Sequence, residues 1–248
     1  MSKRLVLVQS DKGGVGKSTT ARLLGELYRA KGTDILIVDG DGGVGQLTQF
    51  LGIRDLNGRL IIDQGTLGVQ PFTIHGTERD RDMLLDMLAQ NTSNVVLVDL
   101  PAASLSLLRN ADVSLLAIAK EYGYDVTIVS LLTPYRASVR DVGRALEYAP
   151  EATHLIVRNL GFGEPDDFAI WDESSAKKEA AARKAHVIDL TPLKPRIAAA
   201  LDNANMTYHA GVDAPLLGIA DRSRLRTWID ANTATLYGVR GILGMTDE

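Results

Sequence analysis

The residues of this chain best suited to chemistry lie near its start, in the stretch "SDKGGVGKSTT" at positions 10–20. Glycines in such a loop let backbone N–H groups turn inward around phosphate oxygens. Lys17 would then reach the β- and γ-phosphates of a nucleotide, and the Ser18 hydroxyl would hold Mg²⁺. The residues that we expect to bind nucleotide here are Gly13, Gly14, Val15, Gly16, Lys17, Ser18 and Thr19.

This loop departs from the usual pattern G-x-x-x-x-G-K-[ST] at its first glycine, where Asp11 stands and a second lysine, Lys12, follows. The context is nonetheless that of a phosphate loop, because an apolar run precedes it and helix-forming residues follow it. Asp11 therefore marks either a damaged loop that no longer binds nucleotide or a variant in which the extra lysine has a function.

Carboxylates follow two further apolar runs: "ILIVDGDGG" contains Asp39 and Asp41, and "VVLVDLPAA" contains Asp99. The carboxyl ends of parallel strands are where open α/β sheets build their sites. Nucleotide hydrolysis needs a group that positions water and another that holds magnesium, and these acids could supply both. Asp39 has a second interpretation, in which it only caps a turn.

The stretch K-G-G-V-G-K-S-T-T at positions 12–20 resembles the deviant Walker A loop of the ParA/MinD superfamily, in which the position of Asp11 varies and a signature lysine follows it. The resemblance implies that Asp11 is no defect. It also implies that Lys12 crosses an ATP-bound dimer and touches the phosphates of the partner's nucleotide. A solvated loop lysine is the alternative interpretation of Lys12.

The same resemblance gives the acids their roles. Asp41 is similar to the second acid of a D-x-D-P motif, which positions the attacking water, and Asp99 is similar to the Walker B acid. Gly42 replaces the proline of that motif, so we expect a looser switch I and slow hydrolysis. The implied magnesium ligands are Ser18, Asp41 and Asp99. The implied catalytic residues are Lys12, Lys17 and Asp41.

Recognition of the base is indicated by later residues. The guanine motif N-K-x-D is absent, and "HLIVRNLGFG" places Asn159 after a strand. In the superfamily an asparagine at this place contacts adenine, although an asparagine that caps a turn is the alternative. "IDLTPLKPRIAAALDNA" resembles the segment beside the base and puts Pro192 near adenine. Together with "VDLPA" and "VRNLGFGEPDDFAIWD", these segments resemble the plasmid stability and conjugative transfer branch, the StbB/TraL-like proteins.

The elements that must position these residues alternate between apolar runs and helical patterns, which is typical of a mostly parallel sheet covered by helices. We therefore predict an α/β fold, a P-loop NTPase three-layer sandwich, as one domain over residues 1–248. The predicted strands are residues 4–9, 34–38, 94–98, 126–132, 154–158 and 187–190. The predicted helices are residues 18–30, 78–89, 138–148, 174–185 and 195–204.

Two segments leave alternatives open. Residues 104–122 suit a buried helix, but residues 113–119 could form a strand. Residues 53–76 could hold a short hairpin or simply make a long excursion.

Composition excludes several classes of function. The formal net charge of −4 argues against nonspecific nucleic-acid binding by net charge alone. The absence of cysteine excludes iron–sulfur ligation, and with it a metallocluster reductase, and fits a cytoplasmic location. No segment reaches the roughly 18 apolar residues that span a bilayer, and the start of the chain reads as a strand. His75, His154, His186 and His209 lack metal-ligand spacing, and Trp171 and Trp228 read as packing anchors.

The remaining patterns bear on partners. Arg136, Arg140 and Arg144 recur at helical spacing and form either a DNA-contacting stripe or a solvated face. The C-terminal stretch lacks the basic amphipathic tail by which MinD-like proteins bind membranes, so we expect no membrane partner.

Taken together, the resemblance implies a switch ATPase with ATP and Mg²⁺ as cofactors. It would form a nucleotide-dependent homodimer and act on a protein adaptor in plasmid stability, DNA partition or conjugative transfer. Contact with DNA, either direct or through the adaptor, is left open. The alternatives are a small-molecule P-loop kinase or ligase and a nucleotide-bound scaffold with little hydrolysis.

Overall fold

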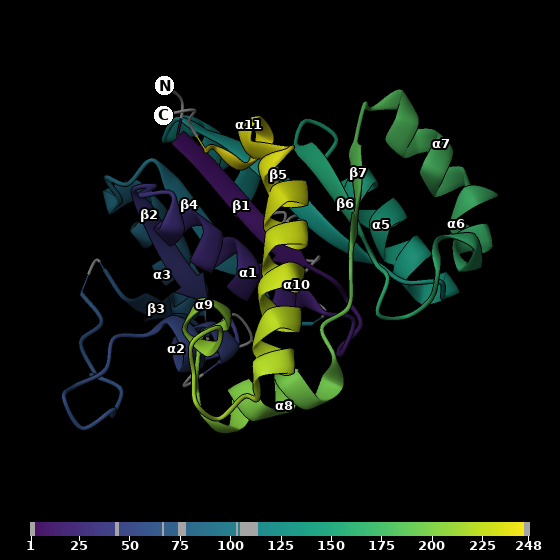
Figure 1. Cartoon of the computed structure of the whole chain (residues 1–248). Coiled ribbons are helices and arrows are strands. Elements are labelled where there is room, and N and C mark those ends of the chain that lie inside the picture. Colours follow the sequence, from purple (N-terminus) through teal and green to yellow (C-terminus); the bar gives the residue numbers. More distant parts are fainter. Residues whose placement is uncertain are drawn as a thin grey trace.

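A seven-stranded sheet forms the centre of the molecule (Figure 1). The computed structural model of the chain describes residues 3–42, 45–65, 67–73, 78–102, 104 and 114–245. The strand order is β3-β2-β4-β1-β5-β6-β7, and every pairing in this sheet is parallel. The strands are β1 (Lys3–Gln9), β2 (Ile35–Asp39), β3 (Val69–Pro71), β4 (Val95–Asp99), β5 (Tyr124–Leu132), β6 (Thr153–Asn159) and β7 (His186–Leu190).

Helices cover both faces of this sheet. Because side chains alternate along a strand, Val6 and Val8 of β1 face one layer of helices and Leu5 and Leu7 face the other. The first layer holds α1 (Lys17–Ala30), α2 (Gln46–Leu51), α8 (Pro195–Asn203), α9 (Tyr208–Gly211), α10 (Ile219–Tyr237) and α11 (Arg240–Leu243). The second holds α3 (Glu78–Gln90), α4 (Leu115–Glu121), α5 (Arg136–Tyr148), α6 (Ala169–Asp172) and α7 (Ser175–Ala182).

The predicted three-layer α/β architecture is therefore confirmed, and each of the six predicted strands is present within three residues of its expected ends. The continuous apolar runs arise because both faces of the sheet are covered. The elements that the sequence analysis missed include strand β3, the long helix α10 and the short helices α2, α6, α9 and α11. Within the described residues, no helix combines the length and apolar character needed to cross a membrane.

Some boundaries and one alternative need correction. The helix expected over residues 174–185 ends at Ala182, because the chain turns at Lys184 with a left-handed φ of 57°. The strand considered for residues 113–119 is wrong, since α4 occupies Leu115–Glu121. Residues 53–76 contain both an isolated antiparallel bridge, Arg54 to Leu60, and strand β3. Residues 66, 74–77, 103 and 105–113 lie outside the described residues, as does His75.

The register of the central strands brings the predicted acids together. Asp39 of β2 is the parallel neighbour of Asp99 of β4, and Asp99 in turn lies beside Val8 of β1. These positions are the carboxyl ends of the strands, and the loop after β1 leaves the same edge toward α1 (Figure 1). One edge of the sheet therefore carries the glycine-rich loop and both acid-bearing segments.

Candidate functional site

The loop between β1 and α1 has the backbone of an anion-binding turn. Gly14 and Gly16 adopt left-handed φ values of 75° and 97°, which residues with a Cβ rarely take. Gly16 is also the N-cap residue of α1 and has no side chain to cap the helix. The free N–H groups and the positive end of the helix dipole therefore point into this loop, where an anion would be stabilised.

Neighbouring side chains fix the shape of the loop. The backbone amide of Lys12 donates to Ser10 Oγ at 3.2 Å, and the carbonyl of Val15 accepts a hydrogen bond from Asn159 Nδ2 at 2.9 Å. Val15 is buried, whereas Lys12, Gly13, Gly14 and Thr19 are exposed. The loop is thus held from beneath and leaves its outer surface open to a ligand.

Asp99 lies buried directly behind the start of α1. Burial raises its pKa to about 7, while a hydrogen bond from the Ser18 hydroxyl and the charge of Lys17 favour its ionised form. Its Oδ1 atom has no hydrogen-bond partner within the described part of the chain. A buried carboxylate oxygen without a partner, next to a serine hydroxyl, fits the oxygen ligands that Mg²⁺ prefers. The residues present therefore fit a magnesium ion.

Asp39 is also buried, but its carboxylate is used within the fold. Oδ2 accepts a hydrogen bond from the backbone amide of Thr48 at 2.7 Å, in the first turn of α2, and Oδ1 accepts one from the amide of Asp41 at 3.3 Å. Burial raises the pKa of Asp39, and these hydrogen bonds oppose that shift. The geometry agrees with the turn-capping interpretation of Asp39, which leaves Asp41 as the exposed acid of this segment.

The segment around Gly42 differs from the expectation of a loose switch. Gly42 has a φ of 70°, and its N–H donates to the carbonyl of Phe72 at 3.0 Å. The amide of Phe72 donates to the carbonyl of Asp39, and Asp41 forms an antiparallel bridge with Thr73. The chain up to Gly42 is therefore hydrogen-bonded to the end of β3 rather than free. Residues 43 and 44 lie outside the described residues.

The residues predicted beside the base surround the turn after β6. Asn159 Oδ1 accepts a hydrogen bond from the amide of Gly161 at 2.9 Å, so this side chain caps the turn as well as bonding the phosphate loop. A Cβ placed on Gly161 would lie 3.6 Å from Pro192 Cβ, which puts Pro192 against the same turn. The structure thus brings Asn159 and Pro192 together at one side of the loop.

Two residues of α10 hold the Pro192 segment: Asn232, which the sequence analysis did not single out, and Trp228, which it read only as a packing anchor. Asn232 Oδ1 accepts a hydrogen bond from the amide of Thr191 at 2.8 Å, and Trp228 Nε1 donates to the carbonyl of Thr191 at 2.7 Å. Trp228 and Trp171 are both buried, as expected of packing anchors.

Among the described residues, no group of three His, Cys, Asp or Glu side chains could hold a metal ion.

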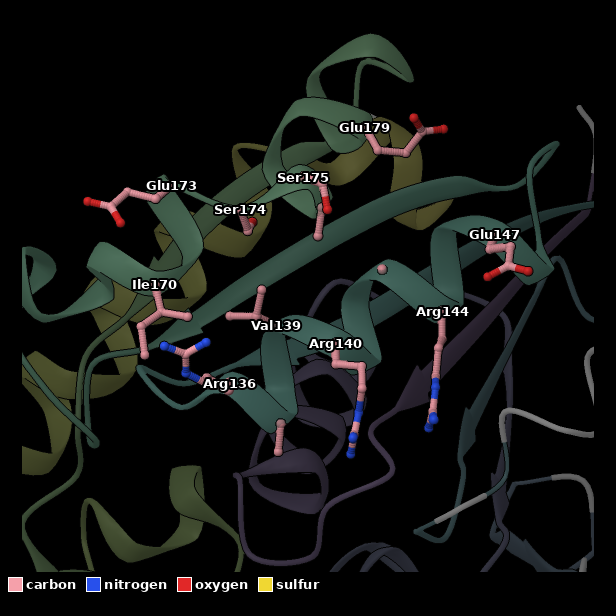
Figure 2. A pocket seen from close by; sticks show the side chains of 13 residues that line it. Arg136, Val139, Arg140, Arg144, Glu147, Ile170, Glu173, Ser174, Ser175 and Glu179 are labelled. Atoms are coloured by element: carbon pink, nitrogen blue, oxygen red, sulfur yellow. The ribbon is translucent and has the colours of Figure 1, made fainter.

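The arginines at positions 136, 140 and 144 lie on α5, along a groove of about 980 Å³ that α6 and α7 complete (Figure 2). Figure 2 shows Arg140 and Arg144 pointing to one side of the helix, away from Glu173 and Glu179, whereas the guanidinium of Arg136 lies beside Ile170. Arg144 Nη1 lies 3.3 Å from Asp11 Oδ2. The last arginine of the row therefore contacts the residue that replaces the first glycine of the loop.

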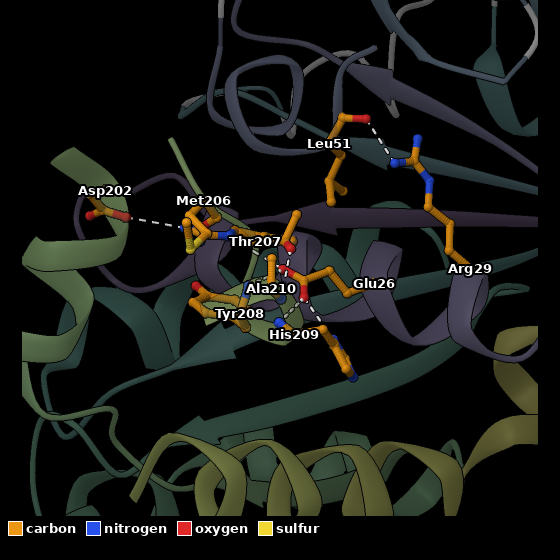
Figure 3. A network of polar contacts seen from close by, with 10 residues as sticks. Glu26, Arg29, Leu51, Asp202, Met206, Thr207, Tyr208, His209 and Ala210 are labelled. Atoms are coloured by element: carbon orange, nitrogen blue, oxygen red, sulfur yellow. Dashed lines mark hydrogen bonds and ion pairs between the residues drawn. The ribbon is translucent and has the colours of Figure 1, made fainter. Parts of the chain in front are cut away.

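A polar network ties α1 to the segment from α8 to α9 (Figure 3). The guanidinium of Arg22 is sandwiched between the rings of Phe50 and Tyr208, 3.6 and 3.8 Å from their centroids. It also bonds Asp202 at 3.1 Å and the carbonyl of Met206. Burial raises the pKa of Tyr208 to about 12, and its hydroxyl bonds Thr19 of the loop. Nothing in the sequence distinguishes Arg22 from a solvated helix residue.

Comparison with known protein families and sequences finds several similar proteins. A family model described as the CobQ/CobB/MinD/ParA nucleotide binding domain matches residues 6–204. A septum site-determining protein MinD of Mesostigma viride is 27% identical to this chain over 163 residues. These residues are 57% of this chain and 54% of the relative, so the match spans about half of that relative's length. Protein MobD of Acidithiobacillus ferrooxidans is 20% identical over 240 residues, 96% of this chain and 99% of MobD.

Among solved structures, a ParA family ATPase from Chlorobium tepidum TLS superposes with a TM-score of 0.56 at 17% identity. The superposition covers 95% of this chain and 99% of that chain. A likeness at this level of identity shows the fold, and it confirms the P-loop NTPase type of three-layer sandwich.

Proposed function

The chain belongs to the CobQ/CobB/MinD/ParA nucleotide-binding domain family, and from that premise we propose that it is an ATPase that dimerises around ATP and Mg²⁺ and uses slow hydrolysis as a switch. The observation that carries the proposal concerns buried Asp99, whose Oδ1 atom finds no hydrogen-bond partner among the described residues. This carboxylate lies beside Ser18 and Lys17 and behind a loop with two left-handed glycines. We take residues 1–248 as one domain of this type, because strands from β1 to β7 join a single sheet.

Each residue of the site has a role in this proposal. The amides of the loop and Lys17 bind the phosphates, and Ser18, Asp41 and Asp99 hold magnesium. When bound, the ion would neutralise charge that develops on the phosphate oxygens. Asp41, which is exposed at the mouth of the site, positions the attacking water. Lys12 reaches the nucleotide of the second copy.

The base would lie beside Asn159 and Pro192. Each amide hydrogen or lone pair of Asn159 that is not used by Val15 or Gly161 is available to adenine, because an amide has two N–H groups and two oxygen lone pairs. Thr191, fixed by Asn232 and Trp228, keeps Pro192 in place against the base.

The setting that we propose is plasmid stability, DNA partition or conjugative transfer in the cytoplasm, with a protein adaptor and direct or indirect contact with DNA. Similarity over nearly the whole length to MobD and to a ParA family ATPase supports this choice, together with the segments that resemble the StbB/TraL-like branch. Nucleotide state would change the dimer surface, and hence binding to the adaptor.

Light scattering tests the proposal directly. The molecular mass in solution is measured with ADP and then with ATP and Mg²⁺ on the Asp41→Ala protein, in which hydrolysis should be slow. Asp213→Ala, at an exposed side chain remote from the loop in sequence, is the matched control and should hydrolyse ATP normally. A mass that doubles only with ATP supports the switch.

Two results would count against the proposal. A mass that is the same with ADP and with ATP would show that no ATP-dependent dimer forms. ATP turnover stimulated by a small metabolite would then favour a small-molecule P-loop kinase or ligase. ATP turnover that is unaffected by Asp41→Ala shows that Asp41 does not position the water.

A further inference from the structure

The ammonium group of Lys12 rests on an aromatic ring. Its Nζ atom lies 4.9 Å from the centroid of the Tyr135 ring, within the range in which a cation is attracted to the face of an aromatic side chain. Tyr135 is 52% exposed and stands between β5 and α5, where it is the N-cap residue of the helix. We propose that Tyr135 is the residue that positions Lys12 for contact with the nucleotide of a second copy, an inference that rests on the proposed function.

The backbone on the lysine side is fixed before any partner arrives. The amide of Lys12 donates to Ser10 Oγ, and the Ser10 hydroxyl donates back to the carbonyl of Lys12 at 3.3 Å. Asp11 is paired with Arg144 of α5, and its amide bonds the carboxylate of Asp141. Only the side chain of Lys12 is left to be oriented.

The backbone on the tyrosine side is equally fixed. The carbonyl of Tyr135 accepts hydrogen bonds from the amide of Ser138 at 3.1 Å and from its hydroxyl at 3.0 Å. Ser138 is fully buried, and its hydroxyl also bonds the carbonyl of Thr133. The ring therefore projects from a fixed turn at the start of α5. Residues of this helix and its N-cap contact both Asp11 and Lys12, the two residues that precede the glycines of the loop.

The kind of contact suits a lysine that must change partners. Arg144 pairs with one oxygen of Asp11, the Asp11 amide bonds the carboxylate of Asp141, and within the described residues neither acid forms an ion pair with Lys12. An ion pair would neutralise the charge and would have to be broken. A ring limits the rotamers of the long side chain and keeps its charge intact for phosphate.

Substitution at position 135 separates the ring from the bulk of the side chain. Tyr135→Leu keeps an apolar side chain without a ring, and Tyr135→Phe keeps the ring. Both are made in the Asp41→Ala background, where the dissociation constant of the ATP–Mg²⁺ dimer is measured by light scattering at increasing dilution. We expect Tyr135→Leu to weaken the dimer about 2- to 5-fold, the factor that an exposed cation–ring contact corresponds to, and Tyr135→Phe to leave it unchanged.

Three controls make the result specific. Tyr122→Leu, at another half-exposed tyrosine, should not change the dimer. Binding of a fluorescent ATP analogue to the dilute monomer should be the same in the Tyr135 and Tyr122 variants as in their parent, because the ring acts only on the contact between copies. The double variant Lys12→Ala/Tyr135→Leu should be no weaker than Lys12→Ala alone, since the ring acts through the lysine.

The outcomes distinguish this inference from the proposed function. If the Asp41→Ala protein forms no ATP-dependent dimer, or if Lys12→Ala leaves the dimer intact, the proposed function is wrong. If Lys12→Ala abolishes the dimer while Tyr135→Leu matches its parent, only the positioning role of Tyr135 is wrong. Equal weakening by Leu and Phe would assign the effect to the hydroxyl and would also overturn the role of the ring.

Discussion

The Nδ1 atom of His209 lies 2.7 Å from Oε2 of Glu26 (Figure 3). Glu26 is a buried residue of α1, and its carboxylate also accepts hydrogen bonds from the amides of Tyr208 and His209, at 2.8 and 2.9 Å. The acid therefore caps the first turn of α9 while the histidine covers it from the solvent side. The helix that carries the phosphate loop is thus joined to α9 by a titratable pair.

This pair predicts a pH dependence of stability. The hydrogen bond to Glu26 raises the pKa of His209, with a further contribution from the charge of Asp230. A raised pKa means that the extra stability is fully present below the ordinary histidine value of about 6.5 and is lost as the pH rises through the folded value. His209→Gln keeps a hydrogen-bond donor that does not titrate. Its free energy of unfolding should fall below that of the parent near pH 6 and approach it near pH 8.5.

Denaturant unfolding at several pH values checks this. The difference should stay below about 1 kcal/mol, because His209 is partly exposed. His154 is buried with a lowered pKa and shifts stability in the opposite direction, but it does so equally in both proteins. Parallel stability curves for the parent and His209→Gln would show that the pair does not titrate as described.

The second prediction concerns Arg22, whose side chain is 3% exposed and lies 3.6 Å from Glu26 Oε1. Arg22→Ala removes the positive charge beside a buried carboxylate and empties the space between two aromatic rings. We expect a loss of about 3–5 kcal/mol in the free energy of unfolding. Arg224→Ala, on the exposed surface of α10, should change it by no more than about 0.5 kcal/mol. Similar losses in the two variants would mean that the Arg22 network adds nothing.

How far the sequence could predict this fold depends on whether a signal is local. Strands β1, β2 and β4 are buried on both faces, so each appears as an uninterrupted apolar run. Strand β3 has only Val69, Gln70 and Pro71, too few residues for any periodicity, and it is fixed by pairing with β2. Helix α10 carries charges around much of its surface and lacks one clear apolar face.

The candidate site divides in the same way. Gly14, Gly16 and Lys17 lie in one short pattern whose chemistry can be deduced from spacing alone. Tyr135 and Arg144 contact the loop from more than 120 positions away, and that proximity depends on β1 and β5 being neighbours in the sheet. The shape of the segment at Gly42 likewise depends on Phe72, which no local pattern connects to it.

The third prediction restores the proline that the resemblance leads one to expect. Proline fixes φ near −65° and has no N–H, whereas Gly42 has a φ of 70° and donates to Phe72. Gly42→Pro should lower the free energy of unfolding by about 2–4 kcal/mol, from backbone strain and one lost hydrogen bond. Gly42→Ala keeps the N–H and should cost less. A Gly42→Pro protein with parental stability would show that this segment readily adopts another backbone.

The last prediction concerns Gly45 and Asp39, which are too close for any side chain at position 45. A Cβ on Gly45 would lie 2.1 Å from Asp39 Oδ1, although the backbone there is ordinary, with a φ of −76°. Gly45→Ala should therefore displace the carboxylate from the amide of Thr48 and lower the free energy of unfolding by about 1–3 kcal/mol. Asp39→Ala loses the same cap, at a cost of about 0.5–2 kcal/mol.

The double variant decides whether the two effects have one cause. Asp39→Ala removes the oxygen that clashes, so adding Gly45→Ala to it should cost little, and the double variant should be nearly as stable as Asp39→Ala alone. Denaturant unfolding of the parent, the two single variants and the double variant completes this cycle. Additive losses would mean that something other than the carboxylate of Asp39 requires a glycine at position 45, the N-cap residue of α2.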